Sequence, residues 1–95
     1  MITIIARRLV RADKVDEYKA LALELAEKSR AEEGNISYTL NERADEPRML
    51  TFIECWKDQE AIKAHGATEH FTRILPQLAA LCEERLPVEQ YITVE

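Results

Sequence analysis

The chain has 95 residues and a formal net charge of −5, from 13 basic and 18 acidic side chains. A chain of this length forms a single domain, residues 1–95, and a net negative charge without a basic stripe argues against nucleic acid as a partner. No apolar run approaches the ~20 residues of a membrane span and the N-terminus lacks the layout of a secretory signal, so we expect no membrane segment and a cytoplasmic location.

The N-terminal segment, residues 2–9, predicts a strand with two apolar faces. Three residues lie on one face and two on the other: Ile2, Ile4 and Ala6 against Ile5 and Leu9. A strand of this kind is typical of a central position in a sheet that is covered on both sides.

A long helix is predicted next, with Asp13 as its N-terminal cap. Apolar and small residues recur after it at helical spacing, namely Val15, Tyr18, Leu21, Ala22, Leu25 and Ser29. Acidic residues in the first turn and basic residues in the last suit the helix dipole. Gly34 predicts the end of this helix.

Two strands are predicted after Gly34. Asn35–Arg43 alternates apolar and polar residues, which indicates an edge strand with one buried face. Ala44–Arg48, with its Asp and Pro, predicts a turn. Met49–Lys57 is apolar on both faces, which favours a second central strand.

Two helices and a final strand complete the chain. Asp58 is expected to cap a short helix that ends at Gly66. A second helix begins near Thr68, carries an apolar stripe that includes Cys82, and should be kinked by Pro76. The last strand is predicted at residues 88–94, opened by Pro87. Neither cysteine has CxxC or metal-finger spacing, so both are interpreted as small core residues.

The order of elements predicts an α+β fold, the ferredoxin-like βαββαβ arrangement with an antiparallel sheet. Its first and third strands are central, in agreement with their two apolar faces. The helices cover only one face, so apolar residues on the other would sit in water. We therefore predict a homodimer that packs sheet on sheet into a dimeric α/β barrel.

The candidate chemistry is concentrated in residues 54–71, which hold the only tryptophan and both histidines. The period of a strand places three of the neighbouring side chains on one face: Phe52, Glu54 and Trp56. Helical spacing turns His65 inward and puts His70 at the edge of the next apolar stripe. A carboxylate, an indole and two imidazoles can thus converge on one partly apolar space.

The run Glu54-x-Trp56-x-Asp58-x-x-Ala61-Ile62-x-x-His65-x-x-Thr68-x-His70-Phe71 resembles the signature of the antibiotic biosynthesis monooxygenase (ABM) domain family, notably its quinol monooxygenase-like members. Gly34-x-x-x-Tyr38-x-Leu40 is similar to the second strand of that family. The resemblance implies a dimeric barrel that oxidises an electron-rich aromatic, a quinol or an anthrone-type polyketide, with O2 and no cofactor.

Two branches of the family fit less well. Haem-degrading relatives place an Asn in the first strand, a Trp where this chain has His65 and a His where it has Leu75, and all three are missing here. A branch that processes a phosphorylated signalling sugar would need a basic anion site. Nothing in the sequence gathers the candidate arginines: Arg7, Arg8, Arg43, Arg48 and Arg73.

Such a reaction needs a base that makes the substrate electron-rich, and a histidine with a pKa of ~6.5 can serve near neutral pH. His65 is assigned as the general base, with Glu54 orienting His65 or His70 or binding a substrate hydroxyl. The catalytic assignments are His65, Glu54 and Trp56, and the substrate-binding ones are Tyr38, His70, Phe71 and Phe52.

Each assignment has a structural alternative. His65 could be a core histidine bonded to a carbonyl, His70 a surface residue, and Glu54 the ion-pair partner of Arg7 or Arg8. A metal site of Glu54, His65 and His70 is disfavoured because one continuous helix would hold the imidazoles about 140° apart, and only a break at Gly66 could bring them together. The alternative functions are a non-catalytic dimeric barrel that binds a small aromatic, and an isomerase-type relative.

Overall fold

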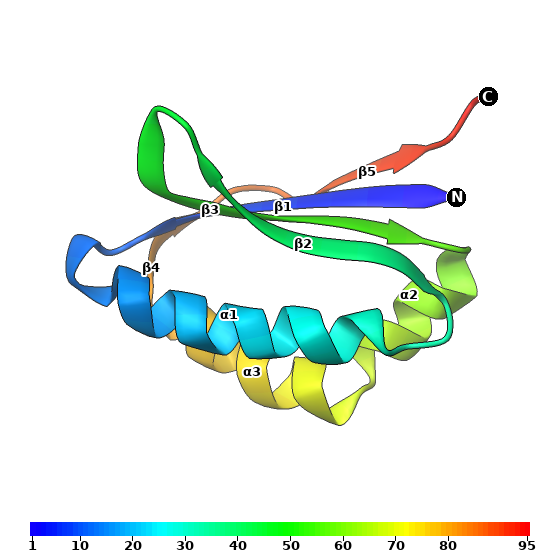
Figure 1. Ribbon diagram of the computed structural model, residues 1–95, viewed down its shortest axis with the longest axis horizontal. Helices are drawn as coiled ribbons and strands as arrows, with labels where there is room; N and C mark the ends of the chain where they lie inside the picture. Colours follow the sequence, from blue (N-terminus) through cyan, green and yellow to red (C-terminus); the bar gives the residue numbers. More distant parts are fainter.

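The computed structural model describes residues 1–95 as one sheet with helices on one of its faces (Figure 1). The elements, in chain order, are β1 (Ile2–Val10), a 3-10 turn (Ala12–Lys14), α1 (Val15–Arg30), β2 (Asn35–Arg43), β3 (Glu46–Trp56), α2 (Gln59–Gly66), α3 (Glu69–Ala80), β4 (Cys82–Arg85) and β5 (Glu89–Ile92). None of the helices combines the length and hydrophobicity that crossing a membrane requires.

The sheet has the strand order β2-β3-β1-β4, and β5 also pairs with β1. All of these pairings are antiparallel. β1 and β3 are therefore central, as predicted, and the α+β ferredoxin-like fold is confirmed.

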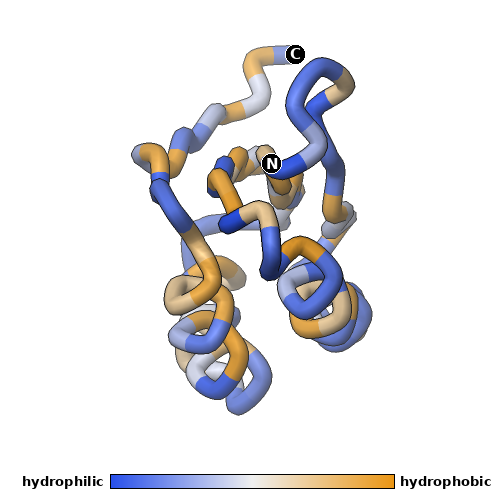
Figure 2. Tube along the Cα trace, turned by 90° about the vertical axis from the view of Figure 1, so that its left-hand side faces the viewer, coloured by the Kyte–Doolittle hydropathy of each residue, from blue (hydrophilic) through white to orange (hydrophobic).

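The core lies between the sheet and the helices. Figure 2 shows the helices as two columns beneath the strands, with hydrophobic and hydrophilic positions alternating along each. The largest fully buried side chains are Trp56, Tyr18, Tyr38, Phe52, Leu25, Leu50, Ile74 and Leu78. They come from both layers, so burial of the apolar helix stripes against the inner sheet face holds the layers together.

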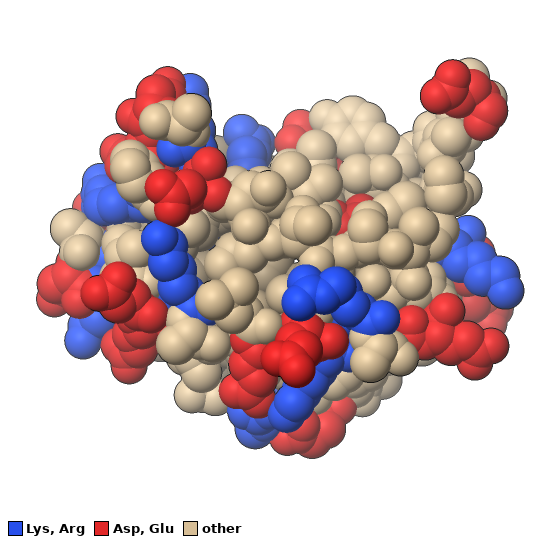
Figure 3. All heavy atoms as spheres, viewed as in Figure 1, with Lys and Arg blue, Asp and Glu red and all other residues tan.

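The opposite face of the sheet has no helix over it (Figure 1). Ile5 of β1 pairs with Ile53 of β3 on this side, and Ile53 is 39% exposed. Figure 3 shows uncharged atoms across the middle of the molecule, with charged side chains toward its ends and along the helices. Coverage of one face only agrees with the prediction, and the second copy on the other face stays a prediction.

Three predicted boundaries were wrong at the first helix and the turn. Asp13 lies in the 3-10 turn and does not cap α1, whose N-cap Lys14 makes no side-chain cap hydrogen bond. α1 ends at Arg30, before Gly34. β3 begins at Glu46, so the turn is confined to residues 44 and 45.

The C-terminal segment also differs from the prediction. Cys82 opens β4 and pairs with Val10 of β1, so it does not belong to the helical stripe. The predicted last strand, residues 88–94, is observed as β5 at Glu89–Ile92. A further short strand that was not predicted, β4 at Cys82–Arg85, shares the same edge of β1, and Pro87 lies in the break between them. Proline has no backbone N–H for a ladder, which accounts for the break. Pro76 lies inside α3, which runs on to Ala80, and the expected kink remains a prediction.

Candidate functional site

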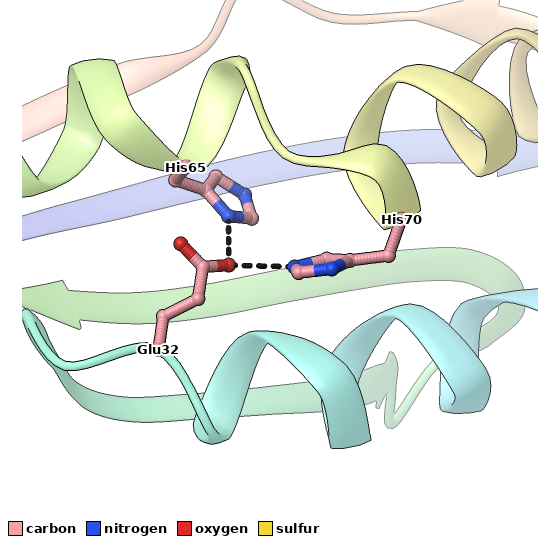
Figure 4. Close-up of side chains that lie close together, drawn as sticks. All are labelled: Glu32, His65 and His70. Atoms are coloured by element: carbon pink, nitrogen blue, oxygen red, sulfur yellow. Dashed lines mark hydrogen bonds and ion pairs between the residues drawn. The ribbon is translucent and has the colours of Figure 1, made fainter.

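A buried cluster joins one carboxylate to two imidazoles. Oε2 of Glu32 lies 2.7 Å from Nδ1 of His65 and 2.7 Å from Nε2 of His70 (Figure 4). The three side chains are 13%, 5% and 15% exposed, respectively. Glu32 comes from the loop after α1, His65 from the last turn of α2 and His70 from the first turn of α3. An ionised carboxylate only accepts hydrogen bonds, so each of these two ring nitrogens must carry a hydrogen.

Two helix caps place the histidines. The Asp58 side chain accepts from the backbone N–H of Ala61, which confirms the predicted start of α2. Oγ1 of Thr68 accepts from the N–H of Phe71 and donates to the carbonyl of His65. The chain therefore changes direction between α2 and α3. This turn brings together two imidazoles that one continuous helix would hold about 140° apart.

Glu32 reaches the histidines because two segments approach each other closely. The backbone of Gly34 lies so near α2 that a Cβ at this position would collide with the Cβ of Ala61. The N–H of Lys57 also donates to the carbonyl of Gly34 at 3.0 Å. The loop between α1 and β2 is thus fixed against the start of α2, with Glu32 beside His65.

Aromatic rings surround His65, which is buried as predicted. Its ring centroid lies 4.5 Å from that of Trp56, 4.8 Å from that of Phe71 and 5.6 Å from that of Tyr38. Burial lowers the pKa of His65, and the hydrogen bond with Glu32 opposes this shift. The imidazole is therefore neutral at neutral pH. Its hydrogen is on Nδ1, and the lone pair of Nε2 faces away from Glu32.

Glu54 makes no hydrogen bond with either histidine, and Glu32 takes the orienting position that was predicted for Glu54. Oε1 of Glu54 accepts from the indole Nε1–H of Trp56 at 2.9 Å. Burial raises the pKa of Glu54 to about 7, although the hydrogen bond from Trp56 opposes the shift. The alternative ion pair with Arg7 or Arg8 is also not formed, because Arg7 pairs with Glu89 and Arg8 belongs to none of the salt bridges.

A cavity of about 300 Å³ lies between the sheet and the helices. Its lining residues are Ile4, Ala6, Arg8, Tyr38, Phe52, Glu54, Ile62, His65, Gly66, Phe71, Leu75 and Val88. Five of the predicted site residues are among them: His65, Glu54, Tyr38, Phe52 and Phe71. Trp56 and His70 are not in the lining, and each instead lies beside His65, with ring centroids 4.5 Å and 6.2 Å away, respectively.

Glu32, His65 and His70 also have the geometry of a metal-binding cluster, because their ligand atoms lie within 4.8 Å of one another. Two imidazoles and one carboxylate suit zinc or iron. The metal set considered from sequence contained Glu54 and was wrong, since Glu32 occupies that place. In the observed geometry the two imidazoles already donate to the carboxylate, so hydrogen bonds alone satisfy the cluster.

Sequence reasoning missed Glu32, and it considered Arg8 only as an ion-pair partner or an anion-site arginine, without placing it in the cavity. Glu32 precedes a glycine in a loop, and no local pattern reveals a contact with residues more than thirty positions away. Arg8 had a usable signal, because it continues the inward face of β1 between Ala6 and Val10. A charged side chain at such a position is unusual.

The sequence matches the family model described as "Antibiotic biosynthesis monooxygenase" over residues 1–77. "Putative monooxygenase YcnE" of Bacillus subtilis (strain 168) is 41% identical over 71 residues, which is 75% of each chain. A solved structure described as an antibiotic biosynthesis monooxygenase is 34% identical, with a TM-score of 0.94 over all of both chains. A conserved protein from Methanosarcina mazei Go1 is 31% identical, with a TM-score of 0.91 over 95% of this chain and 89% of that one.

Proposed function

Because the chain belongs to the antibiotic biosynthesis monooxygenase family, we propose that it uses O2 to oxidise an electron-rich aromatic, such as a quinol or an anthrone-type polyketide, without a metal or organic cofactor. The observation that carries the proposal is the placement of His65. A neutral imidazole, oriented by Glu32, borders an apolar cavity of about 300 Å³.

His65 acts as the general base in this proposal. Nδ1–H donates to Glu32, so Nε2 is free to take a proton from a substrate hydroxyl or an acidic C–H group. The imidazolium that forms lies beside the Glu32 carboxylate, which stabilises its charge, and this arrangement follows the logic of a carboxylate–histidine pair in a hydrolase triad. His70 donates to the same oxygen and helps to hold the carboxylate in place.

The substrate supplies all of the electrons. Once deprotonated, it reduces O2, and one oxygen atom enters the ring while the other leaves as water. For an anthrone, a CH2 group and O2 become a carbonyl group and H2O, a four-electron oxidation matched by the four-electron reduction of O2. The chain contributes the base and a cavity that limits contact of the intermediates with water.

The cavity walls fit a flat substrate. Tyr38, Phe52 and Phe71 present aromatic rings that can stack or meet a substrate edge to face. The Trp56 ring packs against His65, and its indole N–H donates to Glu54. Glu54 is left as the acidic group that can hydrogen-bond a substrate oxygen.

We also propose that two copies pack through the uncovered sheet face. Ile5 and Ile53 pair on that face, and an apolar sheet surface without a partner is costly in water. The variant Ile53→Glu should convert a dimer into a monomer, measured by light scattering at micromolar concentration. The exposed Leu23→Glu on α1 is the matched control. A wild-type monomer would contradict the proposal.

Oxygen consumption with menadiol and with an anthrone tests the proposed reaction, always against the same quinol in buffer because quinols autoxidise. Label from ¹⁸O2 should appear in the product once. His65→Ala should lower kcat/KM by about 10²–10⁴-fold, the usual contribution of a general base. His70→Gln keeps an N–H donor for Glu32 and should retain most of the activity.

Two outcomes would contradict the proposal. If His65→Ala folds and consumes oxygen as fast as wild type, His65 is not the base. If no substrate is oxidised faster than in buffer while aromatic ligands still bind, the chain is a non-catalytic binding protein. Conversion of a substrate without oxygen uptake would favour the isomerase-type alternative.

A further inference from the structure

Arg8 lies on the buried side of the sheet. It occupies β1 between Ala6 and Val10, is 9% exposed and lines the cavity. Arginine is almost never this buried unless it is paired, because removing a guanidinium from water is costly. The position therefore calls for a partner.

The chain supplies no charged partner. Nε of Arg8 has no hydrogen-bond partner, and none of the salt bridges includes Arg8. Arg73, by contrast, pairs with two carboxylates at the surface. The buried hydroxyl of Tyr18 lies near Arg8 and makes no hydrogen bond of normal geometry, and a neutral hydroxyl cannot balance the charge of the guanidinium.

Glu54 shares the cavity with Arg8 but does not neutralise it. The carboxyl of Glu54 accepts from Trp56, and its pKa is raised to about 7 by burial, with Arg8 only a lesser opposing influence. A carboxyl group whose pKa is raised in this way balances an always-charged guanidinium only in part. This leaves positive charge in the cavity that an anionic ligand can balance.

Arg8 and the proposed base, His65, lie beside different positions along β1. Glu54 is paired with Ile4 on β1, and Arg8 is four residues farther along that strand. At a rise of ~3.3 Å per residue, the two backbone levels are roughly 13 Å apart. Trp56, which packs under His65, is paired with Ile2, farther still from Arg8. The cavity therefore has an imidazole toward one end and a guanidinium toward the other.

We propose that the ligand of this cavity is a hydroxylated aromatic acid, whose carboxylate binds Arg8 while its hydroxyl group faces His65. The hydroxyl end of this assignment rests on the proposed function, and the Arg8 end does not. Arginine presents a planar pair of donors that matches a carboxylate. The spacing favours an acid whose hydroxyl lies across the ring system from the carboxylate.

Binding of 6-hydroxy-2-naphthoate and of its uncharged methyl ester, measured by titration calorimetry, tests the proposal without any turnover. Wild type should bind the naphthoate about tenfold or more tightly than the ester, which is the usual strength of a charge-assisted contact. Arg8→Gln should remove this preference and leave the affinity for the ester within about twofold. Arg8→Lys should keep part of the preference.

Arg7→Gln is the matched control, because Arg7 is the neighbour whose side chain points to the outer face and pairs with Glu89. It should leave the preference unchanged. Thermal unfolding of each variant checks that the fold persists. If Arg8→Gln does not fold, the wild-type preference and its weakening in Arg8→Lys decide the matter.

Two results would overturn the proposal: wild type that binds the ester as tightly as the naphthoate, or Arg8→Gln that weakens both equally, which indicates a structural role. These results are separable from the proposed function. A chain that oxidises neutral quinols but ignores the carboxylate keeps the function and loses the Arg8 site. A chain that prefers the carboxylate but oxidises nothing keeps the site and loses the function.

Discussion

The two ends of the cavity differ in how their polar groups are satisfied. At the His65 end, the ring nitrogens facing Glu32 and the indole N–H of Trp56 all have acceptors within the chain. At the other end, Nε of Arg8 and the hydroxyl of Tyr18 have none. Polar groups with partners inside the chain are held in position before a ligand binds. Buried polar groups without such partners can instead form their hydrogen bonds with the ligand.

Glu54 lies between these ends, and its removal should have the largest effect on stability. Its pKa is raised from an ordinary 4.5 to about 7, so the folded state binds this proton more tightly than the unfolded state does. The resulting stabilisation is fully present below pH 4.5 and is lost as pH rises to about 7, a fall of about 3 kcal/mol in unfolding free energy.

Glu54→Gln keeps an acceptor for Trp56 but cannot titrate. At pH 8 it should be more stable than wild type by up to about 3 kcal/mol in urea denaturation. Without the titration of Glu54, the opposite dependence of the unfolding free energy on pH that comes from His65 should become measurable. Because its folded pKa is lowered, its contribution is present above its ordinary pKa of 6.5 and is lost as pH falls. The exposed Glu84→Gln should behave as wild type, and an unchanged pH profile in Glu54→Gln would contradict the assignment.

A second prediction disturbs only the His65 end. Gly34→Ala places a Cβ against that of Ala61 and should lower the unfolding free energy by about 1–3 kcal/mol, the usual cost of overpacking. Adding Ala61→Gly should recover part of this loss, less the ~1 kcal/mol that a helical glycine costs. Gly66→Ala meets open space and should be neutral or slightly stabilising. Equal effects of the two glycine substitutions would show that the close approach is unimportant.

The smallest effect is expected from changing the charge beside His65. Glu32→Gln keeps the size of the side chain but removes the carboxylate, so kcat should fall about tenfold, or ~1.4 kcal/mol. The pKa of His65 should fall further, because the hydrogen bond that raises it is weakened. An NMR titration of the His65 ring measures this shift. Glu33→Gln, the exposed neighbour, should change neither quantity.

Much of the fold could be predicted from local patterns. The two apolar faces of residues 2–9 and 49–57 identified the central strands, and Asp58 supplied the cap that the structure shows. The prediction that Asp13 caps the first helix failed because a 3-10 turn precedes that helix, and the residue type of Asp13 does not distinguish the two cases. The prediction that Cys82 belongs to the last helix failed because a single apolar residue fits a helix and a strand equally well.

The site was less accessible to prediction because its contacts are not local. Helical spacing alone predicted that His65 points inward, and its side chain is buried in the structure. The spacing of His65 and His70 argued against their meeting on one continuous helix, and a break after Gly66 was the stated exception. The change of direction at Thr68 provides that break. Glu32 was invisible because its position depends on the approach of two backbones at Gly34, which no periodicity encodes.

The interruption of the sheet edge at Pro87 affects how a ligand can approach Arg8. A shallow surface depression is lined there by Arg8, Arg85, Leu86, Pro87 and Val88, and two of these, Arg8 and Val88, also line the interior cavity. Had β4 run unbroken into β5, a continuous ladder would have sealed this border of the sheet. The break at Pro87, a residue without an amide hydrogen, thus places this depression beside the guanidinium of Arg8, so an anion that approaches this edge of the sheet is attracted by a positive charge.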